Sequence, residues 1–363
     1  DLNQHPVGLL AEPLLRELDR SRFELFVYAR VMHADALTHR LKGLGLAWRD
    51  CATMSDAEVH AAMQADRIDL LLDMSGYTAG GRPRLLAARA APVQVAWLGY
   101  PFGTGLKSVD YLIGDEQVLP RGSEPLYGER LLRLPVCFVC PQGLAEAPPV
   151  APSPALLRGT VTFGSLNRPN KISADCIALW ARVLKAVPDA RLLVGAVSEA
   201  ATAERLLAQF AAAGIGPERL DLRPRLPTRD YLALHNEIDL LLDTFPYAGG
   251  TTSNHALWMG VPTLTLAGRT LAQRLGAGIM GKVGLSDWVA ESEDAFVAIA
   301  ERAAAHPDEL ARLRQSLRER LMHSPNLSTA RVADSVALAF RLMWRGWCAG
   351  QAPAPIILPR FDE

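Results

Sequence analysis

The feature that most restricts the fold of this chain is an alternation of short, mostly apolar runs with segments of helical periodicity. Residues 93–98 (VQVAWL), 191–197 (RLLVGAV) and 262–267 (PTLTLA) are runs of this kind. Near-continuous apolar strands are typical of parallel sheets that helices cover on both faces. The alternation therefore predicts an α/β fold with parallel sheets.

The expected elements follow one another along nearly the whole chain. Helical spacing of apolar residues predicts helices over residues 8–19, 35–42, 56–65, 83 onward, 174–187, 199–213 and 228–236, and mostly helical sequence from 268 to 347. Apolar runs predict strands over residues 23–29, 44–48, 68–74, 93–98, 111–113, 161–166, 191–197, around 220, 238–242 and 262–267.

One segment interrupts the alternation and predicts a domain boundary. Residues 141–159 contain five prolines and little periodicity, which is typical of a linker. At 363 residues the chain also exceeds the size at which a single core stops growing. We expect two Rossmann-like domains facing one cleft, over residues 1–145 and 146–325. A C-terminal helix and tail, residues 326–363, is expected to pack across both domains.

Residues 243–262 (DTFPYAGGTTSNHALWMGVP) have the pattern of a strand end, a glycine turn and a short helix. Gly249 and Gly250 allow a sharp bend and close approach to a ligand. Thr251 and Thr252 stand where the first free amides of a helix point outward. Those amides, the helix dipole and the two hydroxyls could hold a diphosphate. The alternative is an ordinary helix start after a glycine turn.

Three other loops are expected at the same edge of a sheet as residues 247–252. Residues 76–81 (GYTAGG), 99–105 (GYPFGTG) and 167–171 (NRPNK) each follow a predicted strand. Ligands in open parallel sheets bind beyond the carboxyl ends of the strands. We therefore expect these loops to converge on one ligand.

Composition and charge exclude several other classes of function. A net charge of −1 and a pI near 6.8 give no electrostatic case for nucleic acid or an anionic membrane as a partner. No apolar run approaches the roughly 20 residues needed to span a bilayer. The N-terminus lacks the features of a signal peptide, so a cytoplasmic location is expected. The start at Asp1, without an initiator methionine, suggests a fragment or a processed chain.

The chain contains five cysteines, an odd number scattered along its length, which fits a reducing compartment. Cys137 and Cys140 form a CxxC pair that could bind a metal or act in redox chemistry. These cysteines lie in an apolar, strand-like run, residues 134–141 (LPVCFVCP), and no second cysteine pair accompanies them. We therefore do not expect a metal or redox site here.

Several motifs in the same order resemble the catalytic region of the O-linked N-acetylglucosamine transferase (OGT/SPINDLY-like) family, which has many bacterial members. They cover nearly the whole chain and are DLNQHP at the start, DMSGYTAGG and VQVAWLGYPFGTG in the first half, and FGSLNRPNKI and LDTFPYAGGTTSNHALWMGVPTLTLAG in the second. The resemblance implies a GT-B fold, in which two Rossmann-like domains hold a nucleotide sugar between them. It also implies UDP-GlcNAc or a related nucleotide sugar as donor and a protein or peptide as acceptor. Tetratricopeptide repeats are expected upstream or on another chain.

The resemblance assigns the donor diphosphate to two segments, residues 167–171 and 249–252. Lys171 matches the family lysine that reaches the diphosphate, and a cation there stabilises the charge that develops as the nucleotide leaves. Arg168 falls where animal enzymes have a glutamine near the same group, and Asn167 precedes it. Gly250, Thr251 and Thr252 match the phosphate-binding helix start, although animal members have histidine at the position of Gly250. Gly249, which precedes them, is also expected to contact the donor.

Other residues match positions that hold the base, the ribose and the sugar. Leu226 and Tyr231 match the segment that holds the uracil, with tyrosine replacing a histidine and keeping a flat face. His255 stands where animal members have an aspartate that bonds the ribose, and a neutral imidazole can also donate or accept a hydrogen bond to a hydroxyl. Tyr247 occupies a position close to the sugar, and Gly99, Tyr100 and Pro101 are expected to line the sugar side through backbone contacts.

His5 matches a family histidine beside the sugar and acceptor. An imidazole has the unperturbed pKa that suits proton removal near neutrality. A histidine before a proline can instead be a helix cap. Asp69 and Asp73, on the strand before residues 76–81, are the competing carboxylates.

The resemblance implies direct displacement at the anomeric carbon, with inversion. The chain contains no Asp-x-Asp triplet, so we expect a metal-independent enzyme with no cofactor. Other donors (GDP-fucose, UDP-glucose), an asparagine acceptor, a UDP-sugar epimerase and a non-catalytic nucleotide-sugar-binding module are the alternatives.

Overall fold

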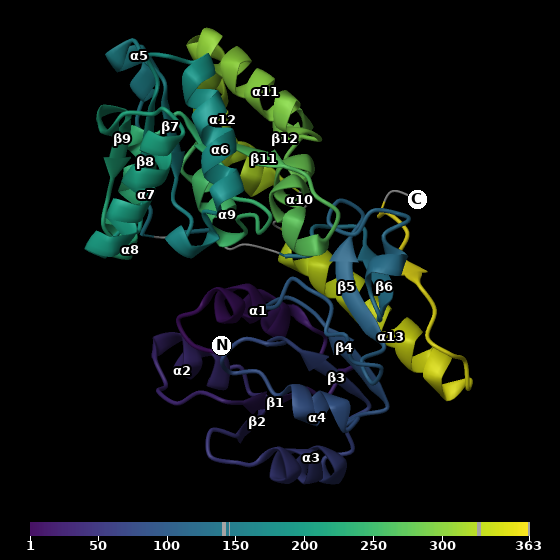
Figure 1. Ribbon diagram of the computed structural model, residues 1–363. Coiled ribbons are helices and arrows are strands. Elements are labelled where there is room, and N and C mark those ends of the chain that lie inside the picture. The colour runs from purple at the N-terminus through teal and green to yellow at the C-terminus, as the bar shows by residue number, and fades with distance from the viewer. Residues whose placement is uncertain (140–142, 145, 325–327, 362–363) are drawn as a thin grey trace. The chain divides into compact units, whose positions relative to one another are not determined.

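The computed structural model describes residues 1–139, 143–144, 146–324 and 328–361. The chain divides into two compact units, residues 143–324 and residues 1–142 with 325–363 (Figure 1). Each unit is described by itself below. None of the described helices combines the length and apolar character needed to cross a bilayer.

The unit formed by residues 143–324 is built on a six-stranded sheet with the order β9-β8-β7-β10-β11-β12. All five pairs of neighbouring strands are parallel. Counted from the first strand of the unit, this is the 3-2-1-4-5-6 order of a Rossmann fold, with its switch point between β7 and β10. The strands are β7 (Thr162–Ser165), β8 (Arg191–Val194), β9 (Leu220–Leu222), β10 (Leu240–Leu242), β11 (Thr263–Leu266) and β12 (Val289–Ala290).

Helices cover both faces of this sheet because consecutive strand residues point to opposite sides. Leu240 and Leu242 of β10 belong to a core cluster shared with α6, α7 and α11, whereas Leu241 belongs to a second cluster shared with α8 and α9. The helices are α5 (Pro154–Arg158), α6 (Ala174–Ala186), α7 (Ala200–Ala212), α8 (Thr228–Leu234), α9 (Thr251–Trp258), α10 (Leu275–Lys282), α11 (Glu293–Ala305) and α12 (Pro307–His323).

The other unit contains a five-stranded sheet of order β13-β6-β5-β4-β3 and a separate pair, β1-β2, with all described pairs parallel. Its strands are β1 (Phe26–Ala29), β2 (Ala47–Asp50), β3 (Leu70–Asp73), β4 (Val93–Ala96), β5 (Tyr111–Asp115), β6 (Arg130–Leu134) and β13 (Ile356–Ile357). Its helices are α1 (Pro6–Glu17), α2 (Ala36–Lys42), α3 (Asp56–Ala65), α4 (Pro83–Ala87) and α13 (Thr329–Cys348).

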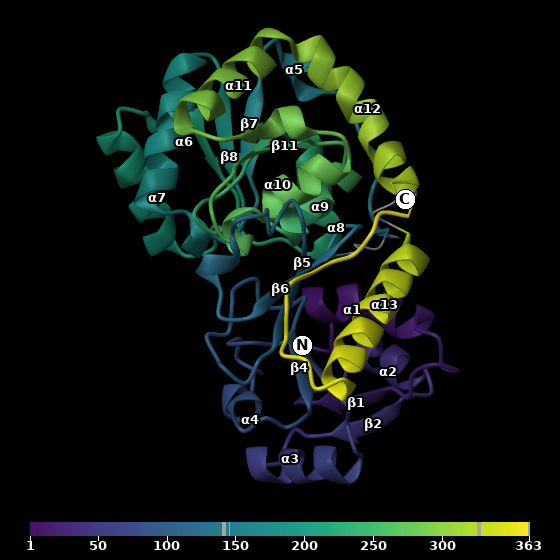
Figure 2. The same cartoon turned by 90° about the vertical axis from the view of Figure 1, so that its right-hand side faces the viewer.

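The C-terminal segment returns to the unit that contains the N-terminus. Helix α13 packs on α1, β4 and β6, and β13 extends the sheet by pairing with β6 (Figure 2). The buried face of α13 includes Val332, Val336, Phe340 and Met343. The unit that contains the N-terminus, residues 1–142 with 325–363, is therefore discontinuous in sequence.

Some predicted elements are displaced in the structure. The apolar run at residues 134–139 was expected to be a strand, but the strand is β6, which ends at Leu134. Cys137 is buried and free, and Cys140 lies outside the described residues. The predicted linker contains the short helix α5, and the strand expected at 44–48 is β2, at Ala47–Asp50.

Candidate functional site

The loop that joins β10 to α9, residues 243–250, is tied down along most of its length. Thr244 Oγ1 donates to the carbonyl of Tyr247 at 2.8 Å, and the amide of Ala248 donates to the carbonyl of Ala272 at 3.1 Å. Ser173 Oγ donates to the carbonyl of Phe245 at 3.1 Å. The loop that the sequence singled out as a phosphate-binding turn is therefore rigidly supported.

Asp243, the first residue of this loop, is buried beneath it. Its Oδ1 accepts the amides of Thr244 at 2.9 Å and Gly249 at 2.7 Å and the Asn167 amide group at 3.2 Å. Its Oδ2 accepts the Thr265 hydroxyl at 2.9 Å. Burial raises the pKa of Asp243 to about 6, although these donors and the Lys171 charge lower it.

Lys171 lies against the same loop. It ends the short helix Pro169–Lys171, its Nζ donates to the carbonyl of Ala248 at 3.0 Å, and it stands 3.6 Å from the centre of the Tyr247 ring. Burial lowers the pKa of Lys171, Asp243 partly opposes this, and Arg168 lowers it further. The structure thus brings together Asn167, Lys171, Tyr247 and Gly249, whereas the Arg168 side chain is exposed.

Helix α9 begins at Thr251, directly after the two glycines. Gly250 is the N-cap, and no side chain among the described residues caps the helix. The amides of the first turn have no partner within the helix, and the dipole makes this end partially positive. Gly250, Thr251 and Thr252 therefore present a terminus that suits an anion, as the sequence predicts.

Tyr231 and His255 form a hydrogen-bonded pair beside this terminus. The Tyr231 hydroxyl lies 3.2 Å from His255 Nδ1, and the Thr252 side chain also interacts with Tyr231. Leu226 and Tyr231 pack together against the core cluster that contains Leu241 and Ala256. Burial lowers the pKa of His255 to about 4, so its imidazole is neutral near pH 7. A neutral ring can donate or accept one hydrogen bond at its second nitrogen.

The remaining predicted residues lie in the other unit. His5 is the N-cap of α1, and its Nδ1 accepts the Val7 amide at 3.3 Å. Asp1 stands 3.7 Å from the same nitrogen. An accepting Nδ1 places the proton of the neutral ring on Nε2. The helix-cap role that the sequence left open is therefore present.

Gly99 and Tyr100 belong to the loop at residues 99–105, which packs closely against the loop that follows β3. A Cβ on Gly99 would lie 1.9 Å from the carbonyl oxygen of Met74, so the close approach requires glycine here. Tyr100 packs against Tyr77 at 5.6 Å and Phe102 at 5.2 Å between ring centres, and Pro101 lies between Tyr100 and Phe102 in the same loop.

Of the two competing carboxylates, Asp73 holds the turn after β3. It accepts the amides of Gly76 at 2.8 Å and Ser75 at 3.3 Å, and burial raises its pKa.

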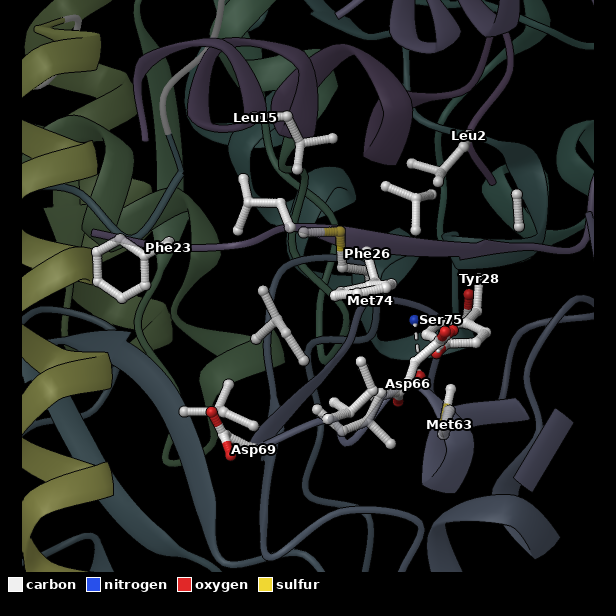
Figure 3. A pocket seen from close by; sticks show the side chains of 18 of the residues that line it. Leu2, Leu15, Phe23, Phe26, Tyr28, Met63, Asp66, Asp69, Met74 and Ser75 are labelled. Carbon is white, nitrogen blue, oxygen red and sulfur yellow. Dashed lines mark hydrogen bonds between the residues drawn. The ribbon is translucent and has the colours of Figure 1, made fainter. Parts of the chain in front are cut away.

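A cavity of about 450 Å³ lies in this unit, lined by β1, β3 and α1 (Figure 3). Its walls are mostly apolar, and of the predicted site residues only Asp69 and Asp73 line it. All four residues of β3 are only partly buried. This cavity is distinct from the loop around Lys171, which belongs to the other unit. The described residues contain no group of three or more His, Cys, Asp or Glu side chains placed to hold a metal ion.

Sequence reasoning missed two buried carboxylates under glycine-containing loops. Asp243 supports residues 244–249, and Glu129, which is 3% exposed, accepts the amide and hydroxyl of Thr104 in the loop at residues 99–105. An aspartate directly after a buried strand and before a glycine turn was the available signal for Asp243. No comparable signal marks Glu129.

The sequence profile of glycosyl transferase family 41 matches residues 1–143 and 154–336. A rice (Oryza sativa subsp. japonica) protein named probable UDP-N-acetylglucosamine–peptide N-acetylglucosaminyltransferase SPINDLY is 38% identical, over 100% of this chain and 40% of its own length. The protein of the same name from Petunia hybrida is 37% identical, over 98% of this chain and 39% of its own length. The chain thus spans about two fifths of the length of these curated relatives.

Solved structures agree with the profile. A mutant of the O-GlcNAc transferase of Thermobaculum terrenum superposes with a TM-score of 0.90 at 38% identity, covering 96% of this chain and 67% of that one. The Anabaena protein HepE, solved in complex with UDP and glucose, has a TM-score of 0.55 at 11% identity, covering 94% of this chain and 97% of that one. At that identity, the second likeness concerns the fold alone.

Proposed function

This chain belongs to glycosyl transferase family 41, and on that basis we propose that it transfers N-acetylglucosamine from UDP-GlcNAc to serine or threonine hydroxyls of an acceptor protein. Its α/β fold of the GT-B type, with two Rossmann-like units, is the one that the resemblance predicts. The observation that carries the proposal is the Lys171 amine bound to the loop that opens into α9. The names of the rice and Thermobaculum relatives support the donor and acceptor classes.

The reaction is a single displacement at the anomeric carbon. The acceptor oxygen forms a bond to that carbon while the bond to the UDP oxygen breaks, and UDP leaves with the electron pair from the opposite face. The configuration inverts, and the hydroxyl proton passes to a base. The enzyme contributes alignment and stabilisation of the leaving diphosphate.

Two groups next to the loop at residues 243–250 supply positive potential to the leaving group. The Lys171 amine has three donors, of which one holds the Ala248 carbonyl, and the free amides at Thr251 and Thr252 add the helix terminus. We propose that these groups bind the diphosphate without a metal. Leu226 and Tyr231 would hold the base, and His255 would meet a ribose hydroxyl as a neutral imidazole.

His5 is the proposed general base, and its present hydrogen bond restricts how it could act. Since Nδ1 accepts the Val7 amide, the neutral ring carries its proton on Nε2. His5 could therefore take a proton only at Nδ1, after giving up the contact with Val7. We propose that Gly99, Tyr100 and Pro101 line the sugar side through backbone contacts.

Transfer assays with Lys171→Ala test the proposal. The protein is incubated with labelled UDP-GlcNAc and a protein acceptor, and both UDP release and modified acceptor are measured. Loss of one preorganised charge at a leaving group reduces turnover by about 100- to 1000-fold. The control is Lys185→Ala, an exposed lysine on α6. Full transfer by Lys171→Ala would contradict the proposed site.

A donor and product panel separates the alternatives. Faster turnover with GDP-fucose or UDP-glucose would reassign the donor, and modified asparagine would reassign the acceptor. Conversion of UDP-GlcNAc to its 2-epimer without an acceptor would indicate an epimerase. UDP binding without transfer or hydrolysis would indicate a binding module.

A further inference from the structure

Asp243 is a fully buried carboxylate for which the proposed reaction has no direct use. It lies 2% exposed at the carboxyl end of β10, and its two oxygens accept four described hydrogen bonds. The donors come from three places: the loop itself, Asn167 after β7, and Thr265 on β11. Asp243 thus ties together the ends of three neighbouring strands and the loop.

The hydrogen bonds of Oδ1 determine which way the loop amides point. This oxygen accepts the amides of Thr244 and Gly249, so the loop closes around one atom. The Gly249 amide therefore faces the carboxylate and is not available to a ligand. The next amides, those of Gly250, Thr251 and Thr252, enter the first turn of α9 and remain for an anion.

Two glycines give the carboxylate the space that it occupies. A Cβ on Gly249 would lie 3.0 Å from Asp243 Oδ1 and 2.8 Å from Ser253 Oγ. A Cβ on Gly276 would lie 2.5 Å from Asp243 Oδ2 and 2.4 Å from Thr265 Oγ1. The space around the Asp243 carboxylate is therefore too small for a longer side chain. A side chain without two acceptor oxygens could not accept hydrogen bonds from all the donors that Asp243 serves.

We propose that Asp243 is the positioning residue of the diphosphate site: by holding the Gly249 amide inward, it orients the amides of Gly250, Thr251 and Thr252 toward the donor. This inference rests on the proposed function, since it assumes that the loop binds a nucleotide diphosphate. Asp243 does not touch the donor and acts through the loop.

The chain contains a matched control at the other end of the same strand. Asp239 directly precedes β10, is 3% exposed, and accepts Ser153 Oγ at 2.6 Å and the amides of Ala155 at 3.1 Å and Thr162 at 2.9 Å. It supports the α5 region and β7 rather than the loop. Asp239→Ala removes a comparable buried carboxylate and should lower stability without changing nucleotide affinity.

The first test compares UDP binding by calorimetry and transfer kinetics in Asp243→Ala, Asp243→Asn and Asp239→Ala. We expect Asp243→Ala to weaken UDP binding at least about tenfold and to raise the donor KM more than it lowers kcat, because misplacing binding groups costs up to about a hundredfold. Asp243→Asn can still accept the Gly249 and Thr244 amides, so UDP affinity should return to within about threefold of wild type. Asp239→Ala should bind UDP as wild type does.

The second test needs no variant and decides the matter if Asp243→Ala does not fold. Amide chemical shifts are followed as UDP is added to the wild-type chain. The amides of residues 250–252 should shift most, and the Gly249 amide should shift little and exchange slowly. A dominant shift at Gly249, equal UDP affinity in a folded Asp243→Ala, or equal weakening by Asp239→Ala would overturn the proposal. Wild-type protein that fails to bind UDP would instead overturn the proposed function.

Discussion

Burial decides the charge states of the titratable side chains around the loop. It lowers the pKa of His255 to about 4 and that of the fully buried His235 to about 3, so both imidazoles are neutral near pH 7. It raises the pKa of Asp243 to about 6 in spite of four donors. The donors satisfy the carboxylate geometrically, but desolvation is the larger effect.

This gives Asp243 a definite effect on stability as pH changes. Its folded pKa of about 6 lies above the unfolded value of 3.8, so its stabilising contribution is complete below pH 3.8 and is lost as pH rises through 6. Relative to Asp243→Asn, wild type should lose on the order of 3 kcal/mol of unfolding free energy between those limits, at about 1.4 kcal/mol per pKa unit. Urea denaturation of both proteins from pH 3.5 to 7.5 measures this. If the unfolding free energy of wild type instead rose with pH relative to that of Asp243→Asn, the hydrogen-bond donors, not burial, would determine the pKa of Asp243.

Single residues divide into those that a motif could predict and those that it could not. Lys171, Thr251 and Thr252 were predicted because each lies in a recognisable motif of consecutive residues, and the structure places the Lys171 amine on the loop that precedes Thr251. Asp243 and Glu129 were not, because their significance arises from burial and from partners on other strands. The His255 contact with Tyr231 spans 24 residues and likewise follows only from the fold.

At the scale of elements, local signals placed helices better than strands. The predicted helix at 56–65 has the bounds found for α3, because Ser55 and Glu58 form a capping box at its start. Strand β6 was missed because its sequence, RLLRL, places arginines among the leucines. Arg133 is nevertheless buried, where it donates to the carbonyl of Leu119 and pairs with Glu124.

Helix α1 allows the cap and the base roles of His5 to be separated. Asparagine is a good N-cap but cannot take a proton near neutral pH, so His5→Asn should keep the melting temperature of the protein. Transfer should fall by about 100- to 10,000-fold, the usual contribution of a general base. His5→Ala should lose about 1 kcal/mol of stability as well. Normal transfer by His5→Asn would show that His5 is only a helix cap, and Asp73 would become the candidate general base.

At the scale of the whole molecule, the alternation of elements predicted the α/β class and the Rossmann order of residues 143–324 agrees with it. The discontinuity of the first unit could not be predicted. Helix α13 has a strong apolar face, but nothing in its own sequence states which surface it covers. Its packing on α1, β4 and β6 depends on residues that are far away in sequence, since β6, the nearest of the three, ends at Leu134.

Removing residues 325–363 should therefore damage one unit selectively. The shortened chain would lose β13 from the edge of β6 and the apolar face of α13 from α1. We expect residues 1–142 to become sensitive to limited proteolysis while residues 143–324 stay resistant, because the two core clusters described for residues 143–324 contain no residue of the removed segment. Mass spectrometry of the fragments identifies the protected region. Equal protection of both units would contradict the assignment of α13.

The same connectivity orders events during synthesis on the ribosome. Residues 143–324 emerge as a complete unit, while residues 1–142, which are translated before them, still lack the last helix and the edge strand of their own unit. Until residue 357 has left the exit tunnel, the nascent chain exposes the surface of α1 that α13 later covers and an unpaired edge on β6. Chaperones that shield such surfaces would be needed for residues 1–142 rather than for residues 143–324.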